Sequence, residues 1–154
     1  DNVGYPARAI RTSDYLYIMN LKSDRWPAGD PVPAESPLWP GFHDIDNGPT
    51  KTVIMNNASK WPEFFAMGYE KRGQEQLFDI KNDPGCAKNL AGDKQFSSVK
   101  KNLRAKLIKE LKAQNDPRMT GNGDVFDSYP RFGEMREFEG FREQGKYNPA
   151  YQKK

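Results

Sequence analysis

The sequence predicts an α+β fold, in which a small antiparallel β-sheet packs against one long amphipathic C-terminal helix, with long irregular loops and an aromatic tail. Three observations predict it. Two strand-like runs lie within residues 7–21, a short alternating run lies at residues 76–80, and apolar side chains recur every three or four residues through 93–114. A helix on one face of a small sheet buries the apolar side of both elements.

Residues 7–21 are predicted to form a β-hairpin around a polar turn at residues 12–14. Its second strand is rich in Tyr and Ile, which suit a half-buried pleated surface. A two-stranded hairpin is marginally stable alone. We therefore expect a third strand, which residues 76–80 supply.

Residues 22–51 are predicted to form a long loop excursion. Proline removes a backbone donor and restricts the residue before it, so no long strand or helix fits here. A loop of this length in a small domain is typically functional or covers a neighbouring surface. Half of the 12 prolines lie here: Pro27, Pro31, Pro33, Pro37, Pro40 and Pro49.

Two short helices are predicted after the excursion. The first follows Pro49, with Val53, Ile54 and Met55 facing inward. The second spans residues 62–67, where a proline is well placed in the first turn.

The long helix at 93–114 has a complete set of boundary signals. Asp93 is a suitable N-cap, and the Asn-Asp-Pro sequence at 115–117 stops the helix. Its outer face is basic, which is typical of a solvated helix surface, and the alternative is that this face binds a partner. The apolar stripe is Phe96, Val99, Leu103, Leu107 and Leu111, and the outer face is Lys100, Lys101, Arg104, Lys106, Lys109, Glu110 and Lys112.

We expect one domain over residues 1–120, followed by an irregular tail at 121–154. The tail is rich in aromatic residues and glycine but has no periodicity. Aromatic side chains in this number favour contact with a surface, so the tail is expected to wrap the domain or a neighbouring domain.

Composition argues against several classes of function. The net charge is +3, from 24 Lys+Arg scattered among 21 Asp+Glu, whereas nucleic-acid binding favours a concentrated basic stripe. One cysteine and one histidine exclude a disulfide framework and multi-thiolate or multi-histidine metal sites. No run approaches the roughly 20 apolar residues that span a bilayer. We therefore expect neither a nucleic-acid partner nor a membrane partner, and no metal site in this chain.

Polar residues of the excursion are the candidates for ligand binding. His43, Asp44 and Asp46 could bind a cation or sugar hydroxyls, although capping of the turn before residue 49 explains the aspartates as well. In an extended segment Asp44 and Asp46 would share a face. Arg25 and Trp26, together with Lys51, could hold a sulfated or carboxylated sugar; Trp26 could equally be a hydrophobic anchor. This list comprises Arg25, Trp26, His43, Asp44, Asp46 and Lys51.

Residues 76–91 (QLFDIKNDPGCAKNLA) resemble the C-terminal signature of sulfatases, E-L-Y/F-D-L-x-x-D-P-x-E-x-x-N-L-A, with Cys86 where that family often has Glu. Residues 6–18 resemble its first C-terminal hairpin, P-x-R-A-I/V-R-T-x-x-Y/F-x-Y-I. Residues 44–51, 126–130 and 146–149 resemble the heparan N-sulfatase (N-sulfoglucosamine sulfohydrolase) branch and its bacterial relatives.

The resemblance implies a two-part parent hydrolase with a large N-terminal α/β domain of the alkaline-phosphatase-like superfamily. That domain would hold a divalent cation, usually calcium, and a formylglycine made from Cys or Ser in a C-x-P/A-x-R motif. The residues after Cys86 depart from this motif, so no catalytic residue and no cofactor is assigned to this chain, and we expect it to be inactive alone. The chain would start within a longer protein that is secreted, periplasmic or lysosomal.

The resemblance thus predicts a C-terminal sulfatase subdomain with a structural and substrate-entrance role. Its partners would be the N-terminal catalytic domain and a sulfated carbohydrate. The six excursion residues above would face the substrate. The alternative is a module that binds sulfated glycans without cleaving them. Without its catalytic domain the chain would expose an apolar surface, which favours self-association.

Overall fold

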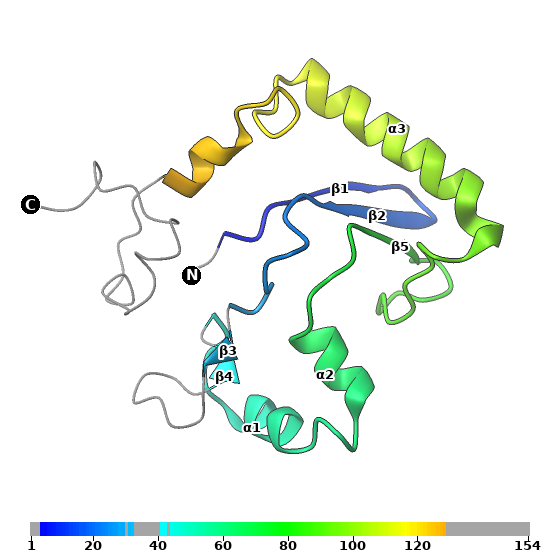
Figure 1. Ribbon diagram of the computed structural model, residues 1–154. Coiled ribbons are helices and arrows are strands. Elements are labelled where there is room, and N and C mark those ends of the chain that lie inside the picture. Colours follow the sequence, from blue (N-terminus) through cyan, green and yellow to red (C-terminus); the bar gives the residue numbers. More distant parts are fainter. Residues whose placement is uncertain (1–3, 30, 33–40, 43, 129–154) are drawn as a thin grey trace, which may run out of the picture.

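A computed structural model describes residues 4–29, 31–32, 41–42 and 44–128 of the chain. The α+β prediction is confirmed: a three-stranded antiparallel sheet of order β1-β2-β5 packs against the long helix α3 (Ser97–Ala113). In the view of Figure 1, α3 lies above this sheet, and α1 (Pro49–Asn56) and α2 (Pro62–Gly68) lie below it.

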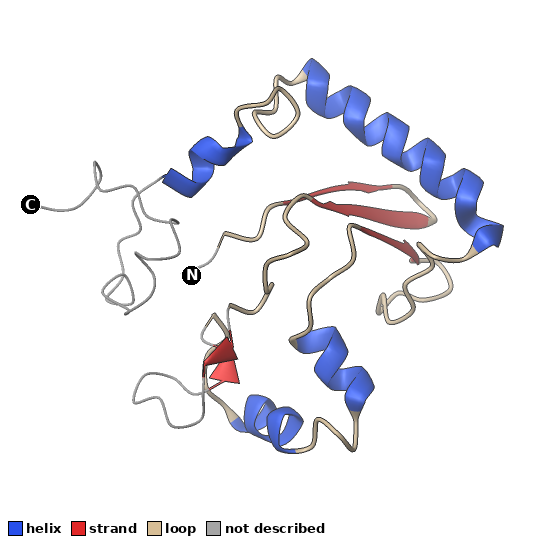
Figure 2. Ribbon diagram, in the orientation of Figure 1, coloured by secondary structure: helices blue, strands red, loops and turns tan. Residues whose placement is uncertain are grey.

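The sheet is built on the predicted hairpin. Strands β1 (Ala7–Arg11) and β2 (Tyr15–Asn20) pair with Arg11 opposite Leu16, and the Thr12 hydroxyl accepts a hydrogen bond from the Tyr15 amide at 3.0 Å. Strand β5 (Glu75–Asp79) supplies the predicted third strand and begins one residue earlier than expected. It pairs with β2, which is therefore central (Figure 2).

The main core lies between this sheet and α3. Tyr17 and Leu77, opposite each other on β2 and β5, are fully buried. They pack with Leu103, Leu107 and Leu111, which come from one face of α3. The predicted helix stripe is therefore the face that meets the sheet.

Both ends of the long helix follow the predicted signals. The Asp93 carboxylate accepts a hydrogen bond from the Gln95 amide at 2.9 Å, and a 3₁₀ turn, η1 (Lys94–Phe96), precedes α3. At the other end Asn115 adopts a φ of +54°, a left-handed conformation that asparagine tolerates and that often follows a helix. The Asp116 amide then bonds back to the Leu111 carbonyl at 2.9 Å.

The polar residues of segment 76–91 hold the connection from β5 to α3. Asp83 accepts a hydrogen bond from the Lys88 amide at 2.8 Å. The Asn89 carboxamide oxygen accepts hydrogen bonds from the amides of Leu77 and Ala91, each at 3.0 Å. These side chains satisfy backbone donors in a connection that has no regular secondary structure, so their role here is to fix the chain path.

A second, smaller core forms within the insert between β2 and β5. The insert contains a minimal strand pair, β3 (Pro31–Val32) with β4 (Gly41–Phe42), and the helices α1 (Pro49–Asn56) and α2 (Pro62–Gly68). Its centre is a buried group of Ala28, Phe42 and Tyr69, which we call the insert core; among the residues packed around it are Trp26, Ile45, Ile54, Met55 and Phe65.

Both short helices are confirmed, but the inward orientation of Val53 is wrong. Ile54 and Met55 pack against the insert core, whereas Val53 is 49% exposed. Successive helix residues are about 100° apart, so three in a row cannot all face one side.

Within the predicted tail the structure describes residues 121–128, which include the 3₁₀ helix η2 (Gly123–Ser128). The rest of the predicted tail, residues 129–154, lies outside the described residues, and the division at residue 120 stays a prediction. Among the residues that the structure describes, no helix combines the length and the apolar character needed to cross a membrane.

Candidate functional site

Five of the six candidate residues from the sequence fall in the described part of the chain, and His43 lies outside it. Trp26 is half-buried at the edge of the insert core, with its ring centroid 5.5 Å from that of Phe42. The Lys71 ammonium lies 5.1 Å from the Trp26 ring centroid. One side of Trp26 thus packs in the hydrophobic core while a cation lies over its ring.

Lys51 is buried in the first turn of α1 and is 7% exposed. Its ammonium donates hydrogen bonds to the Phe42 carbonyl at 2.7 Å, the Ile45 carbonyl at 2.8 Å and the Asn47 side-chain oxygen at 3.2 Å. Burial lowers the pKa of Lys51, and the Asp46 carboxylate opposes that shift. An ammonium has three N–H donors. All three are used in these hydrogen bonds, which connect α1 to β4 and to the segment between them.

Asp44 and Asp46 do not lie on an extended strand. Residues 44–45 form a turn and a bend, so the alternation expected of an extended segment does not apply. The Asp44 amide donates to the Ala28 carbonyl at 3.1 Å. The backbone passes so close to Gly29, which has a φ of +83°, that a Cβ there would lie 2.9 Å from the Asp44 nitrogen. Glycine at position 29 permits this approach.

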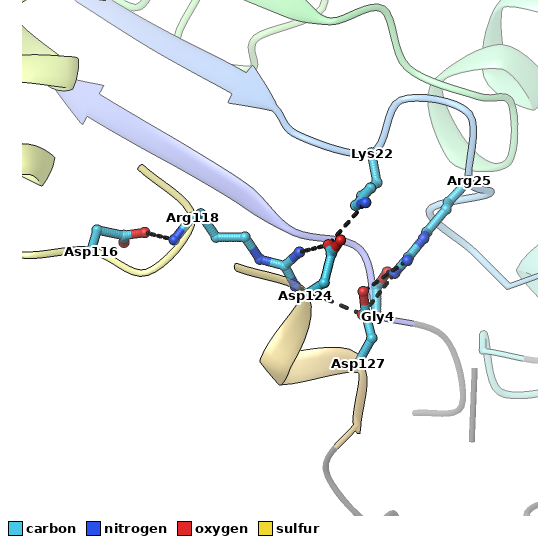
Figure 3. A network of polar contacts seen from close by, with 7 residues as sticks. All are labelled: Gly4, Lys22, Arg25, Asp116, Arg118, Asp124 and Asp127. Carbon is cyan, nitrogen blue, oxygen red and sulfur yellow. Dashed lines mark hydrogen bonds and ion pairs between the residues drawn. The ribbon is translucent and has the colours of Figure 1, made fainter. Parts of the chain in front are cut away.

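Arg25 joins three distant parts of the chain (Figure 3). Its guanidinium makes a bidentate contact with the Asp127 carboxylate, with two hydrogen bonds of 2.9 Å, and also donates to the Gly4 carbonyl at 2.8 Å. Fork-to-fork contacts of this kind are among the stronger charge-assisted hydrogen bonds. Arg25 thereby links the N-terminal segment and the start of the insert to η2.

Further charges extend this contact into what we call the ion network, comprising Lys22, Arg25, Arg118, Asp124 and Asp127. Asp124 contacts Lys22 at 2.9 Å and Arg118 at 3.4 Å. Arg118, with a side chain only 6% exposed, also lies 3.7 Å from Asp127. Hydrogen bonding by Arg25 lowers the pKa of the Asp127 carboxyl, against the opposing effect of burial.

The ion network is expected to make stability depend on pH. The pKa of Asp127 is lower in the folded than in the unfolded chain. The ionised carboxylate therefore adds to the free energy of unfolding at pH values above its unfolded pKa of about 4, and this contribution is lost as the pH falls through its folded pKa. Asp127→Asn should cost about 2 kcal/mol near pH 7, since the pair is mostly buried, and much less near pH 2.5. Urea unfolding at both pH values measures this difference.

Asp124→Asn is the matched control, because the Asp124 side chain is 77% exposed. Its effect should stay below about 1 kcal/mol near pH 7, as for other exposed ion pairs. An Asp127→Asn effect of the same size at both pH values would contradict a role for the ionised carboxylate.

The residues that sequence reasoning missed surround a cleft of about 460 Å³ between the sheet and α3. We call it the basic cleft. Lys100 and Arg104 lie 3.4 Å and 3.6 Å from the Glu75 carboxylate, which also accepts a hydrogen bond from the buried Tyr17 hydroxyl at 2.7 Å. Its polar lining includes Asn20, Gln74, Glu75, Lys100, Lys101 and Arg104.

The one indication of this cleft in the sequence was the spacing of four residues between Lys100 and Arg104, which places both cations on the same side of the predicted helix. The sequence did not show that Glu75, the first residue of β5, would lie 3.4 Å and 3.6 Å from these two cations.

Metal-ligating side chains are not clustered in the described ranges. Within residues 4–29, 31–32, 41–42 and 44–128, no three of His, Cys, Asp and Glu are grouped so as to hold a metal ion. Cys86 lies in a tight turn with a φ of +52°, and its amide bonds to the Asp83 carbonyl at 3.0 Å. The following residues, Ala-Lys-Asn-Leu, do not fit the formylglycine motif.

Comparison with known proteins finds a similarity to a sulfatase. No family model matches the chain. The chain is 26% identical over 112 residues to an ulvan-active sulfatase from Formosa agariphila. The match covers 73% of this chain and 18% of that protein, so the chain spans less than a fifth of its relative's length. The similarity supports a relationship to sulfatases, which are hydrolases.

Proposed function

We propose that the chain is the C-terminal subdomain of a sulfatase that acts on a sulfated sugar, with the catalytic groups in a preceding N-terminal domain. The observation that carries this proposal is the 112-residue similarity to an ulvan-active sulfatase. The resemblance of residues 76–91 to the sulfatase signature supports it. In this chain the polar residues of that segment bond to backbone groups, which fits a structural rather than a catalytic role.

The partner in this proposal is the N-terminal catalytic domain, which would supply the formylglycine and a divalent cation, with calcium as the expected ion. Exposed apolar side chains on α1 and α2 fit a surface that another domain covers: Val53 and Phe64 are each 49% exposed and Met67 is 45% exposed. The same surface would let the isolated chain self-associate.

The substrate would be an acidic, sulfated saccharide. The relative's name points to ulvan, whereas the resemblance to the heparan N-sulfatase branch points to N-sulfoglucosamine. In either case the parent protein would be secreted, periplasmic or lysosomal. Arg25 and Lys51 are engaged within the chain. The candidates for contact with substrate are therefore Trp26, Asp44 and Asp46, together with His43, which lies outside the described residues.

Sulfate release tests this function directly. We expect the protein that carries this chain behind its catalytic domain to release sulfate from ulvan oligosaccharides or from N-sulfated glucosamine. The chain alone should release none above a blank, because its sequence contains no C-x-P/A-x-R motif from which a formylglycine nucleophile could be made. In the two-domain protein, Trp26→Ala should raise KM with little change in kcat, by removal of a stacking surface for sugar.

Two results would contradict the proposal. Sulfate release by the chain alone would place a catalytic centre in it. If the longer protein released sulfate neither from any sulfated saccharide nor from a generic aryl sulfate, the result would favour a second candidate function, a non-catalytic glycan-binding module. The basic cleft is the observation that supports this second candidate.

A further inference from the structure

We propose that the basic cleft is a binding site for the sulfate and carboxylate groups of an acidic oligosaccharide. The inference rests on the proposed function for the identity of the ligand as a saccharide. The cleft itself gives the preference for anions, because three cationic side chains, Lys100, Lys101 and Arg104, line it together with a single carboxylate, Glu75. The excess of positive charge favours an anionic ligand.

Glu75 fixes the positions of two of the cations. The fully buried Tyr17 donates to one carboxylate oxygen of Glu75 at 2.7 Å, which orients that carboxylate. Arg104 lies 3.6 Å from the same oxygen, and Lys100 lies 3.4 Å from the other. Lys100 also donates to the Ala91 carbonyl at 2.7 Å. Cations held in place before binding lose less conformational entropy when a ligand arrives.

The charges that remain available are those of Lys101 and Arg104. Lys101 is exposed, and the Arg104 side chain, which contacts Glu75 through Nε, is 55% exposed. A guanidinium offers further N–H donors in the fork geometry that matches sulfate or carboxylate oxygens. These two side chains would contact the anionic groups directly, while Lys100 and Glu75 act as positioning residues.

The remaining lining suits a sugar better than a simple ion. Ser23 and Gln74 add a hydroxyl and a carboxamide to the lining of the cleft. Met19 and Leu21 add apolar surface, against which the C–H faces of a sugar ring can pack. The volume of about 460 Å³ lies within the range of about 300–1,000 Å³ common for small-ligand sites.

The cleft is distinct from the ordinary solvated surface of α3. Lys106, Lys109 and Lys112 are exposed on the same helix, but none of them lines the cleft. A double variant at Lys106 and Lys109 is therefore a suitable control, because it removes the same total charge from α3 as a double variant at Lys101 and Arg104.

Titration calorimetry of the chain with a heparin-derived tetrasaccharide is the test, at two salt concentrations. The variant Lys101→Ala/Arg104→Gln should bind about tenfold more weakly than the wild type, the loss expected for two partly exposed ion pairs. The control Lys106→Ala/Lys109→Gln should bind as the wild type does. The desulfated tetrasaccharide, which keeps its carboxylates, should bind more weakly than the sulfated one. Thermal unfolding checks that both variants are folded.

The inference would be overturned if the control variant lost as much affinity as the Lys101/Arg104 variant, or if the Lys101/Arg104 variant bound the tetrasaccharide as tightly as the wild type does. It would also be overturned if the wild type showed no measurable binding. The assay does not depend on catalysis. If the two-domain protein releases sulfate but the Lys101/Arg104 variant binds normally, the inference about the cleft fails alone. If the cleft binds the probe and no sulfate is ever released, the proposed function fails alone.

Discussion

Replacing Lys51 by methionine is expected to lower the free energy of unfolding by about 3 kcal/mol, because the change leaves the three acceptors around the buried ammonium without their donor. The acceptors are the carbonyls of Phe42 and Ile45 and the side-chain oxygen of Asn47. Methionine keeps most of the apolar volume of lysine, so loss of packing contributes little. Chemical denaturation monitored by tryptophan fluorescence measures the effect, since Trp26 packs in the same core.

Lys109→Met is the matched control, because Lys109 is exposed on α3. Its effect should stay within about 0.5 kcal/mol, as for most surface substitutions. A Lys51→Met protein with wild-type stability but weaker binding of sulfated saccharide would contradict the structural role and favour the substrate-facing role that the sequence suggested.

Replacing Leu77 by alanine is expected to cost about 3 kcal/mol, within the range of about 2–5 kcal/mol seen when a large buried aliphatic side chain is truncated. Leu77 has no exposed surface and lies opposite Tyr17 beneath α3. A cavity at this point would remove contacts from the sheet and the helix together. Thermal unfolding followed by far-ultraviolet circular dichroism should show a lower Tm with one cooperative transition.

Val53→Ala provides the comparison for Leu77. Val53 is 49% exposed on α1, and alanine is the better helix former, so the change should fall within about 0.5 kcal/mol of zero. If Leu77→Ala were equally mild, the main core would not lie between β5 and α3 as described.

Local patterns in the sequence predicted the main body of the fold. The hairpin, the third strand and the long helix each have a periodicity or a boundary signal within a few neighbouring residues, such as the Asp93 cap. Val53 was misplaced because a run of three apolar residues does not specify a helical face. The β3–β4 pair has only two residues in each strand, too few for any alternation to be recognised.

The candidate site was harder to predict, because its charges are compensated by distant residues. Arg25 meets Asp127 across 102 positions of sequence, and Glu75 reaches Lys100 and Arg104 only when the sheet and α3 pack together. A charged residue in an irregular segment resembles a ligand-binding group until its partner is known. Lys51 was such a case, since its partners are mainly backbone carbonyls, which carry no sequence signal.

The order of strands in the sheet has an evolutionary consequence. The end of β2 and the start of β5 are neighbours: Met19 pairs with Glu75, and the Asn20 amide donates to the Gln74 carbonyl at 2.8 Å. The segment between them therefore leaves and re-enters the sheet at one point, and the entropy cost of closing such a loop rises only logarithmically with its length. Relatives could lengthen, shorten or exchange this segment as a cassette without shifting the strand register, which would let new surfaces arise on an unchanged scaffold.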